Sequence, residues 1–154
     1  MTSPVSISWQ RLIQQAEGLL SVSSNRISNA ANLSALVYHE LADVSWAGFY
    51  FLYDKTLMVG PFQGKPACVS IDMGKGVCGT AAVSGKTIRV ADVEAFDGHI
   101  ACDTEARSEL VVPLCKQGEL LGVLDIDSKR LDRFSQEDEA GLAALAQVYL
   151  SSIA

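Results

Sequence analysis

Two apolar runs near the C-terminal end of the chain constrain its fold more than any other feature. Residues 110–114 and 120–126 are rich in Val, Leu and Ile, and Gln117-Gly118-Glu119 lies between them. Two such runs joined by a short turn that contains a glycine predict an antiparallel hairpin. A hairpin is marginally stable alone in water, so other elements must cover one of its faces.

Helical patterns lie on both sides of this hairpin. Apolar residues recur at helical spacing over residues 9–21, and a second helix is expected after Ser24 or Asn25, either of which can cap it. A last helix is expected to begin after Ser135, with Asp138 three residues further on. The N- and C-terminal parts of the chain are therefore predicted to be helical.

The middle of the chain supplies the rest of a sheet. Residues 76–83 predict a short helix that ends near Gly85, and four more strands are expected at residues 47–53, 56–59, 67–71 and 87–90. This order predicts an α+β fold, with a central antiparallel sheet of about six strands and the N- and C-terminal helices packed on one face. Since no linker or repeat is visible, residues 1–154 are expected to form one domain.

Composition excludes several classes of protein. Of the 154 residues, 49% are hydrophobic and 19% are charged, which is enough apolar material for a core. The formal net charge of −6 leaves no basic stripe for nucleic acid. No apolar run approaches the roughly 20 residues of a membrane span, so no membrane partner is expected. Because residues 1–8 do not resemble a signal peptide, a cytoplasmic location is expected.

Four cysteines are the next feature of interest. Cys68, Cys78, Cys102 and Cys115 are too few for a disulfide scaffold and include no Cys-x-x-Cys pair. Their wide spacing is also a weak signal for structural zinc. Buried packing is one interpretation of each. His99, three residues before Cys102, could stabilise a thiolate, although a solvent-facing histidine remains the alternative.

One glycine motif suggests a nucleotide site. Residues 74–79 match G-x-G-x-x-G, which binds dinucleotides only at the first turn of a βαβ unit in a parallel sheet. Here the motif follows two helices and a predicted hairpin. The glycines are therefore better explained by a tight entry from a strand into a helix.

Carboxylates in the hairpin give the sharpest chemical signal. Asp125 and Asp127 alternate onto one face of an apolar strand. A three-residue turn would pair Glu109 with Asp127 and crowd three carboxyls, and their repulsion would raise at least one pKa. A solvated sheet face is the alternative. The same register places Cys115 far along the strand, as an expected core cysteine outside this patch.

Two aromatic residues lie on a common face of the first predicted strand. Trp46 and Tyr50 alternate onto that face and could form the wall of an apolar pocket. Ordinary core packing is the alternative explanation.

Several spaced motifs resemble one enzyme family. GPFQGKPAC at residues 60–68, GKGVCGT at 74–80, GHIACD at 98–103, SELVVPL at 108–114 and GVLDIDS at 122–128 closely resemble the free methionine-(R)-sulfoxide reductases. These are single GAF-domain enzymes, and the resemblance covers nearly the whole chain. Asp97 stands where this family more often has proline.

The resemblance implies a role for each candidate residue. Cys102 would be the catalytic cysteine, Cys68 the main resolving cysteine and Cys78 a secondary thiol. The family's active-site acids and pocket aromatics match Glu109, Asp125, Asp127, Trp46 and Tyr50. Amides of Ile100, Ala101 and Asp103 would bind the substrate carboxylate, and Asp125 would bind its ammonium group.

The resemblance also implies a reaction and its partners. Cys102 would become a sulfenic acid and then form a disulfide that thioredoxin reduces. The proton would come from Glu109 or Asp127. No metal or organic cofactor is expected, and a homodimer is implied. The alternatives are a non-catalytic GAF module that binds a small ligand or senses redox state, and a metal-dependent hydrolase that uses the acids and His99.

Overall fold

A six-stranded antiparallel sheet forms the centre of the structure, a computed structural model that describes residues 9–99, 102 and 105–154. The strand order is β3-β2-β1-β6-β5-β4, and every neighbouring pair is antiparallel. The strands are β1 (Trp46–Tyr53), β2 (Thr56–Gly64), β3 (Ser70–Asp72), β4 (Ile88–Val90), β5 (Ser108–Lys116) and β6 (Glu119–Ser128). The predicted α+β fold with a six-stranded sheet is confirmed.

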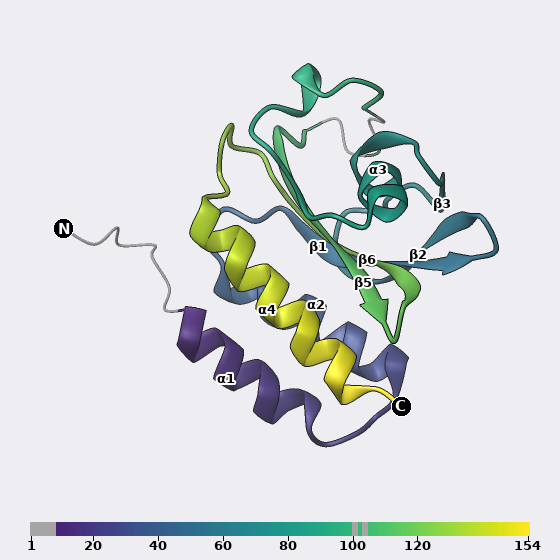
Figure 1. The fold of residues 1–154 in the computed structure, drawn as a ribbon. Helices are drawn as coiled ribbons and strands as arrows, with labels where there is room; N and C mark the ends of the chain where they lie inside the picture. Colours follow the sequence, from purple (N-terminus) through teal and green to yellow (C-terminus); the bar gives the residue numbers. More distant parts are fainter. Residues whose placement is uncertain (1–8, 100–101, 103–104) are drawn as a thin grey trace.

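Helices cover the two faces of the sheet unequally (Figure 1). On one face lie α1 (Trp9–Leu20), α2 (Arg26–Glu40) and α4 (Gln136–Ser152). The other face carries α3 (Gly76–Ser84), and the 3₁₀ turn η1 (Val93–Ala95) precedes β5. The prediction of terminal helices on one face is therefore confirmed. None of the helices in the described ranges has the length and apolarity that a membrane crossing needs.

The larger core lies between the sheet and the three helices. Its fully buried side chains come from all of these elements, and the rings of Phe49 and Tyr149 lie 4.7 Å apart at their centroids. A second apolar cluster lies between the sheet and α3. This second cluster contains Trp46, Tyr50 and Cys78. The candidate site therefore belongs to the smaller core, under α3.

The helix ends follow the sequence signals closely. Asn25, and not Ser24, caps α2, and its side chain accepts a hydrogen bond of 2.9 Å from the Ser28 N–H. Ser135 and Asp138 form a reciprocal capping box at the start of α4. Such short-range signals are reliable because both partners lie within one turn of the helix.

The predicted bounds of β2 and β3 were wrong. β2 continues through Gly60 and Pro61 to Gly64, beyond the predicted end at residue 59. It can do so because the β1–β2 register shifts between Gly48 and Tyr50, and the resulting bulge accommodates a proline that has no N–H for the ladder. β3 is shorter than predicted and begins at Ser70.

The β5–β6 hairpin reaches the predicted register by a different route. Gln117 and Gly118 form a two-residue turn with φ values of 53° and 79°, so the predicted three-residue turn is wrong. A register shift at Leu114/Cys115 leaves Leu121 outside the ladder and restores the predicted pairing further along the strands. Glu109 consequently lies opposite Asp127, as predicted.

Cys115 differs from its prediction. It lies beside this bulge, opposite Leu120, and its side chain is exposed. The expectation of a core cysteine was wrong because the strand end near the turn extends beyond the region where side chains are buried. Cys115 lies toward the turn end of β5, whereas Glu109 lies near the start of the same strand.

Candidate active site

Three carboxylates form the floor of the candidate site. Glu109 of β5 faces Asp127 of β6, and Asp125 lies two residues away on the same face of β6. All three are buried, and Asp125 is only 4% exposed. The solvated sheet face considered as an alternative is therefore wrong. The sequence folds in this way because the bulge at the other end of the hairpin sets the register that brings Glu109 and Asp127 together.

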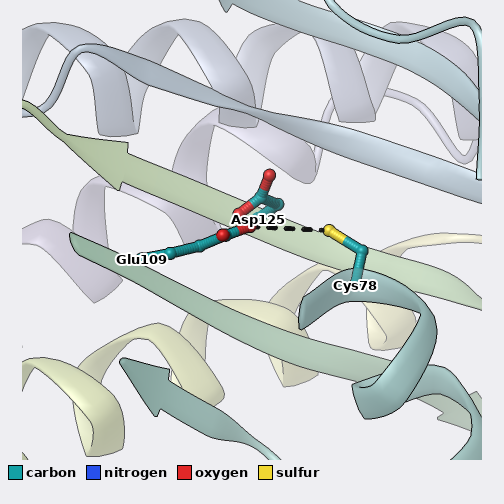
Figure 2. Close-up of side chains that lie close together, drawn as sticks. All are labelled: Cys78, Glu109 and Asp125. Atoms are coloured by element: carbon teal, nitrogen blue, oxygen red, sulfur yellow. Dashed lines mark hydrogen bonds between the residues drawn. The ribbon is translucent and has the colours of Figure 1, made fainter. Parts of the chain in front are cut away.

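Cys78 closes the cluster from above the sheet. It lies on α3, and its Sγ–H donates a hydrogen bond of 3.7 Å to Oε2 of Glu109 (Figure 2). The α3 helix can approach the sheet because of the glycine motif before and within it. Gly74 has a φ of 84°, and a Cβ on Gly79 would lie 2.6 Å from the carbonyl oxygen of Asp72. The motif follows an antiparallel strand and has no βαβ context.

Burial raises the pKa values of several groups in this cluster. The pKa of Asp125 is raised well above its ordinary value by burial and by the charges of Asp127 and Glu109. Burial also raises the pKa of Glu109, although hydrogen bonds and the nearby His99 act against this rise. The pKa of Cys78 is raised by burial and by the same carboxyls. Protonated acids are therefore favoured here.

The same cluster has the spacing of a set of metal ligands. One ligand atom each from Cys78, Glu109 and Asp125 lie within 4.8 Å of one another. A metal ion needs deprotonated thiol and carboxyl ligands, whereas the raised pKa values favour the protonated forms. Oδ1 of Asp125 is buried and has no hydrogen-bond partner among the described residues. That oxygen is free to accept a hydrogen bond from a bound molecule.

Two other cysteines are joined beside this cluster. Cys68, which follows β2, and Cys102, in the segment between η1 and β5, form a disulfide with their Cα atoms 5.2 Å apart. They are 34 residues apart in the chain. These are the two cysteines to which the family resemblance assigned the catalytic and resolving roles. Cys78 remains a free, buried thiol.

An aromatic wall completes the site. The rings of Trp46 and Tyr50 stack with centroids 5.9 Å apart, and Phe62 of β2 stacks on Trp46 at 5.2 Å. Sequence reasoning found Trp46 and Tyr50 but missed Phe62, because the strand was expected to end before it. The missed signal was the pairing of Phe62 with Gly48, where the absence of a side chain leaves room for the Cα and Cβ atoms of Phe62.

A small cavity joins these groups. It has a volume of about 50 Å³ in this disulfide-bonded form. The residues that line it include Trp46, Tyr50, Cys78, His99, Cys102, Glu109, Asp125 and Asp127. Two larger hollows, of about 600 and 520 Å³, lie elsewhere, and none of the described residues that line them is a cysteine. The smaller cavity is therefore the candidate site, because cysteines, acids and aromatic rings converge on it. The predicted residues Ile100, Ala101 and Asp103 lie outside the described residues.

Comparison with known proteins identifies the family of this chain. Residues 30–153 match the GAF domain family. The chain is 52% identical to the free methionine-R-sulfoxide reductase of Escherichia coli over 127 residues, which cover 82% of this chain and 77% of that protein.

Two solved structures of free methionine-R-sulfoxide reductases also superpose closely on this chain. The reduced form of fRMsr of Staphylococcus aureus superposes with a TM-score of 0.95 at 44% identity, and each chain is covered completely. Free methionine-R-sulfoxide reductase from Neisseria meningitidis, in complex with its substrate, gives a TM-score of 0.92 at 35% identity and covers 98% of this chain and 94% of that one. This chain therefore belongs to the GAF-domain family and, within it, to the free methionine-(R)-sulfoxide reductases.

Proposed function

We propose that this protein is an oxidoreductase that reduces free methionine-(R)-sulfoxide to methionine by thiol chemistry. The observation that carries the proposal is the Cys68–Cys102 pair beside a cavity with three buried carboxyls and an aromatic wall. Similarity to the reductases of E. coli and N. meningitidis supports it. Reduction of a sulfoxide needs a nucleophilic thiol and a proton for the departing oxygen, and this site offers both.

The first step transfers the oxygen to the protein. The Cys102 thiolate attacks the sulfoxide sulfur while a protonated carboxyl, Glu109 or Asp127, gives its proton to the sulfoxide oxygen. The hydroxyl then passes from the substrate sulfur to the Cys102 sulfur as the substrate S–O bond and the transient S–S bond break. Methionine leaves, and Cys102 becomes a sulfenic acid. The substrate is reduced by two electrons and Cys102 is oxidised by two. Burial raises the pKa of Glu109, and this direction supports its assignment as a proton donor.

The second step forms the disulfide. The Cys68 thiol attacks the sulfenic sulfur of Cys102, the new S–S bond forms, and water leaves. A dithiol reductant of the thioredoxin type then restores both thiols by exchange. Cys78 would act as a secondary thiol, because burial raises its pKa and disfavours its thiolate form.

Substrate binding follows from the same groups. Trp46 and Tyr50 would contact the S-methyl group, and the free Oδ1 of Asp125 would accept a hydrogen bond from the ammonium group. Amides of residues 100, 101 and 103 would bind the carboxylate. A site that pairs both charged ends of an amino acid rejects methionine sulfoxide within a peptide, where those ends are amides.

Four further statements belong to this proposal. Residues 1–154 act as one GAF domain, the protein acts in the cytoplasm, two copies form a homodimer, and thioredoxin is the physiological reductant. The homodimer and the reductant follow from the family resemblance, and the other two statements are the expectations from the sequence. Sedimentation of the purified protein tests the homodimer, and exchange of thioredoxin for glutathione in the assay tests the reductant.

A coupled assay tests the activity. NADPH consumption is followed with thioredoxin, thioredoxin reductase and either epimer of free methionine sulfoxide. We expect turnover with the R epimer alone, loss of turnover in Cys102→Ser, and full turnover in Cys115→Ser, whose exposed thiol lies outside the site. Absence of turnover in the unmodified protein would favour a ligand-binding or redox-sensing GAF module. Turnover that a chelator leaves unchanged would rule out the metal-dependent hydrolase.

A further inference from the structure

Both pocket aromatics hold the backbone of the segment that carries Cys68. The indole Nε1–H of Trp46 donates a hydrogen bond of 3.1 Å to the carbonyl oxygen of Lys65. The Tyr50 hydroxyl donates one of 3.2 Å to the carbonyl oxygen of Cys68 itself. Residues 65–69 lie between β2 and β3 and have no regular secondary structure. The two bonds therefore attach an irregular segment to the central strand β1 at two points.

An ion pair ties the same segment to the one that carries Cys102. Nζ of Lys65 lies 3.3 Å from the carboxylate of Glu105, which is three residues after Cys102. The Glu105 carboxylate also lies 2.8 Å from Nζ of Lys129, which follows β6. Hydrogen bonds from Lys129 and Lys65 lower the pKa of Glu105, so this carboxylate is charged. The two segments that the disulfide joins are thus also joined by noncovalent contacts.

These contacts affect disulfide formation for a geometric reason. A disulfide forms only when the two Cα atoms lie roughly 4.4–6.8 Å apart, and here they lie 5.2 Å apart. A thiol on an unattached loop would spend much of its time outside that range, and its effective concentration at the Cys102 sulfur would fall. The contacts described above join the loop to β1 and to the Cys102 segment in addition to the S–S bond.

We propose that Tyr50 and Glu105 are positioning residues for disulfide closure, Tyr50 through the Cys68 backbone and Glu105 through Lys65. The inference rests on the proposed function, because closure follows the formation of the Cys102 sulfenic acid. In that step Cys68 gives its thiol proton, Cys102 gives its hydroxyl, water leaves and the S–S bond forms. The ring of Tyr50 contacts the substrate, and its hydroxyl positions Cys68 for disulfide closure.

A single-turnover experiment separates the two steps. Fully reduced protein is mixed with free methionine-(R)-sulfoxide in the absence of any reductant. Methionine release reports the first step, and acid quenching followed by alkylation and intact mass reports the closed disulfide. Dimedone, which reacts with sulfenic acids, reports how long Cys102 stays unresolved. The variants are Tyr50→Phe, which keeps the ring and removes the hydroxyl, and Glu105→Gln, which keeps the size and removes the charge.

Each variant has a matched control in the chain. Tyr53→Phe makes the same change on the same strand at a side chain that is 62% exposed. Glu139→Gln breaks an exposed pair with Arg89, with N–O separation 3.1 Å, away from the cysteines. We expect closure to slow by roughly 5-fold in Tyr50→Phe and roughly 3-fold in Glu105→Gln, with more dimedone adduct in both. Methionine release should be unchanged in Glu105→Gln, and in Tyr50→Phe it should fall less than closure does.

The outcomes distinguish this inference from the function on which it rests. If closure is as fast in both variants as in the controls, the positioning role is wrong while the enzyme assignment stands. If both steps fall equally in Tyr50→Phe, the hydroxyl supports only the pocket, which also contradicts the inference. If the unmodified protein releases no methionine, both proposals fail. The effect of Glu105→Gln should shrink at high salt, because its ion pairs are exposed.

Discussion

Asp125 lies on a central strand with almost no access to water, and its charge is opposed by two further carboxyls. Such a group is retained at a cost in stability, because burial disfavours its ionised form. At the scale of single residues, the site combines groups that are unfavourable for the folded state and useful for proton transfer.

Replacement of Asp125 by asparagine should stabilise the protein in a pH-dependent way. The folded-state pKa lies above the unfolded value of about 3.9, so the unfolded chain loses this proton first as the pH rises. Stability is therefore greatest below the unfolded pKa and is lost toward the folded pKa, by about 1.4 kcal/mol for each unit of difference. In urea unfolding, Asp125→Asn should gain stability over the original protein as the pH rises above the unfolded pKa of about 3.9.

A control and a contrary result are available for this prediction. Asp97→Asn makes the same change at an exposed side chain and serves as the control. A free energy difference between Asp125→Asn and the original protein that stays constant with pH would contradict the origin in burial.

The proton donor can be assigned by isosteric amides. Glu109→Gln and Asp127→Asn each remove one titrating group at the paired positions of β5 and β6. The variant that lacks the donor should lose roughly 10²-fold or more in the rate of methionine release and should lose the fall in that rate at alkaline pH. Single-turnover rates measured against pH for both variants give the assignment. Unchanged profiles in both would contradict carboxyl catalysis.

At the scale of elements, the β5–β6 hairpin has most influence on the site. Its two-residue turn and its bulge together set which face Glu109 occupies, because a slip of one residue would turn that side chain away from Asp127. The bulge lies at the opposite end of the strands from the acids. A feature remote from the chemistry thus determines whether the acids meet.

The turn gives a prediction with a built-in comparison. Gly118 has a φ of 79°, where a Cβ costs about 1–2 kcal/mol, so Gly118→Ala should lower the free energy of unfolding by about that amount. Gly18 lies within α1, and a Cβ there would meet nothing within 4 Å. Gly18→Ala should therefore raise the free energy of unfolding by roughly 0.5–1 kcal/mol. Chemical denaturation measures the free energy of unfolding of both variants. Changes of the same sign in the two variants would contradict the prediction.

At the scale of the whole molecule, the two faces of the sheet have separate tasks. One face lies under α1, α2 and α4 and carries the larger apolar core (Figure 1). The face under α3 carries the acids and the free buried thiol. Packing on the first face therefore supports stability without contributing groups to the site.

This division can be tested at the contact between α1 and α4. The Trp9 ring lies against Gly141, where a Cβ would come within 2.1 Å of it. Gly141→Ala should therefore cost about 1–3 kcal/mol of stability through overpacking, although alanine favours helix locally. Thermal unfolding measures the loss, and closure of the Cys68–Cys102 disulfide should keep its rate. A changed closure rate would show that the two faces are coupled.

Local patterns alone predicted much of this architecture. The caps at Asn25 and Ser135, the end of α3 near Gly85 and the alternation of Asp125 with Asp127 are short-range properties of the chain. Such features depend on neighbours within a few residues, so a single sequence contains them. The resemblance to a reductase family, carried by ordered motifs, added the roles of the cysteines.

Only the tertiary structure decided the features that depend on contacts between distant segments. The continuation of β2 past Pro61, the stacking of Phe62 on Trp46 and the exposure of Cys115 depend on bulges and on neighbouring strands. The bonds from Trp46 and Tyr50 to the Cys68 segment join residues 18 or 19 positions apart. Sequence determined which groups this protein has, and packing decided which of them meet, because register and burial arise only when the whole sheet is assembled.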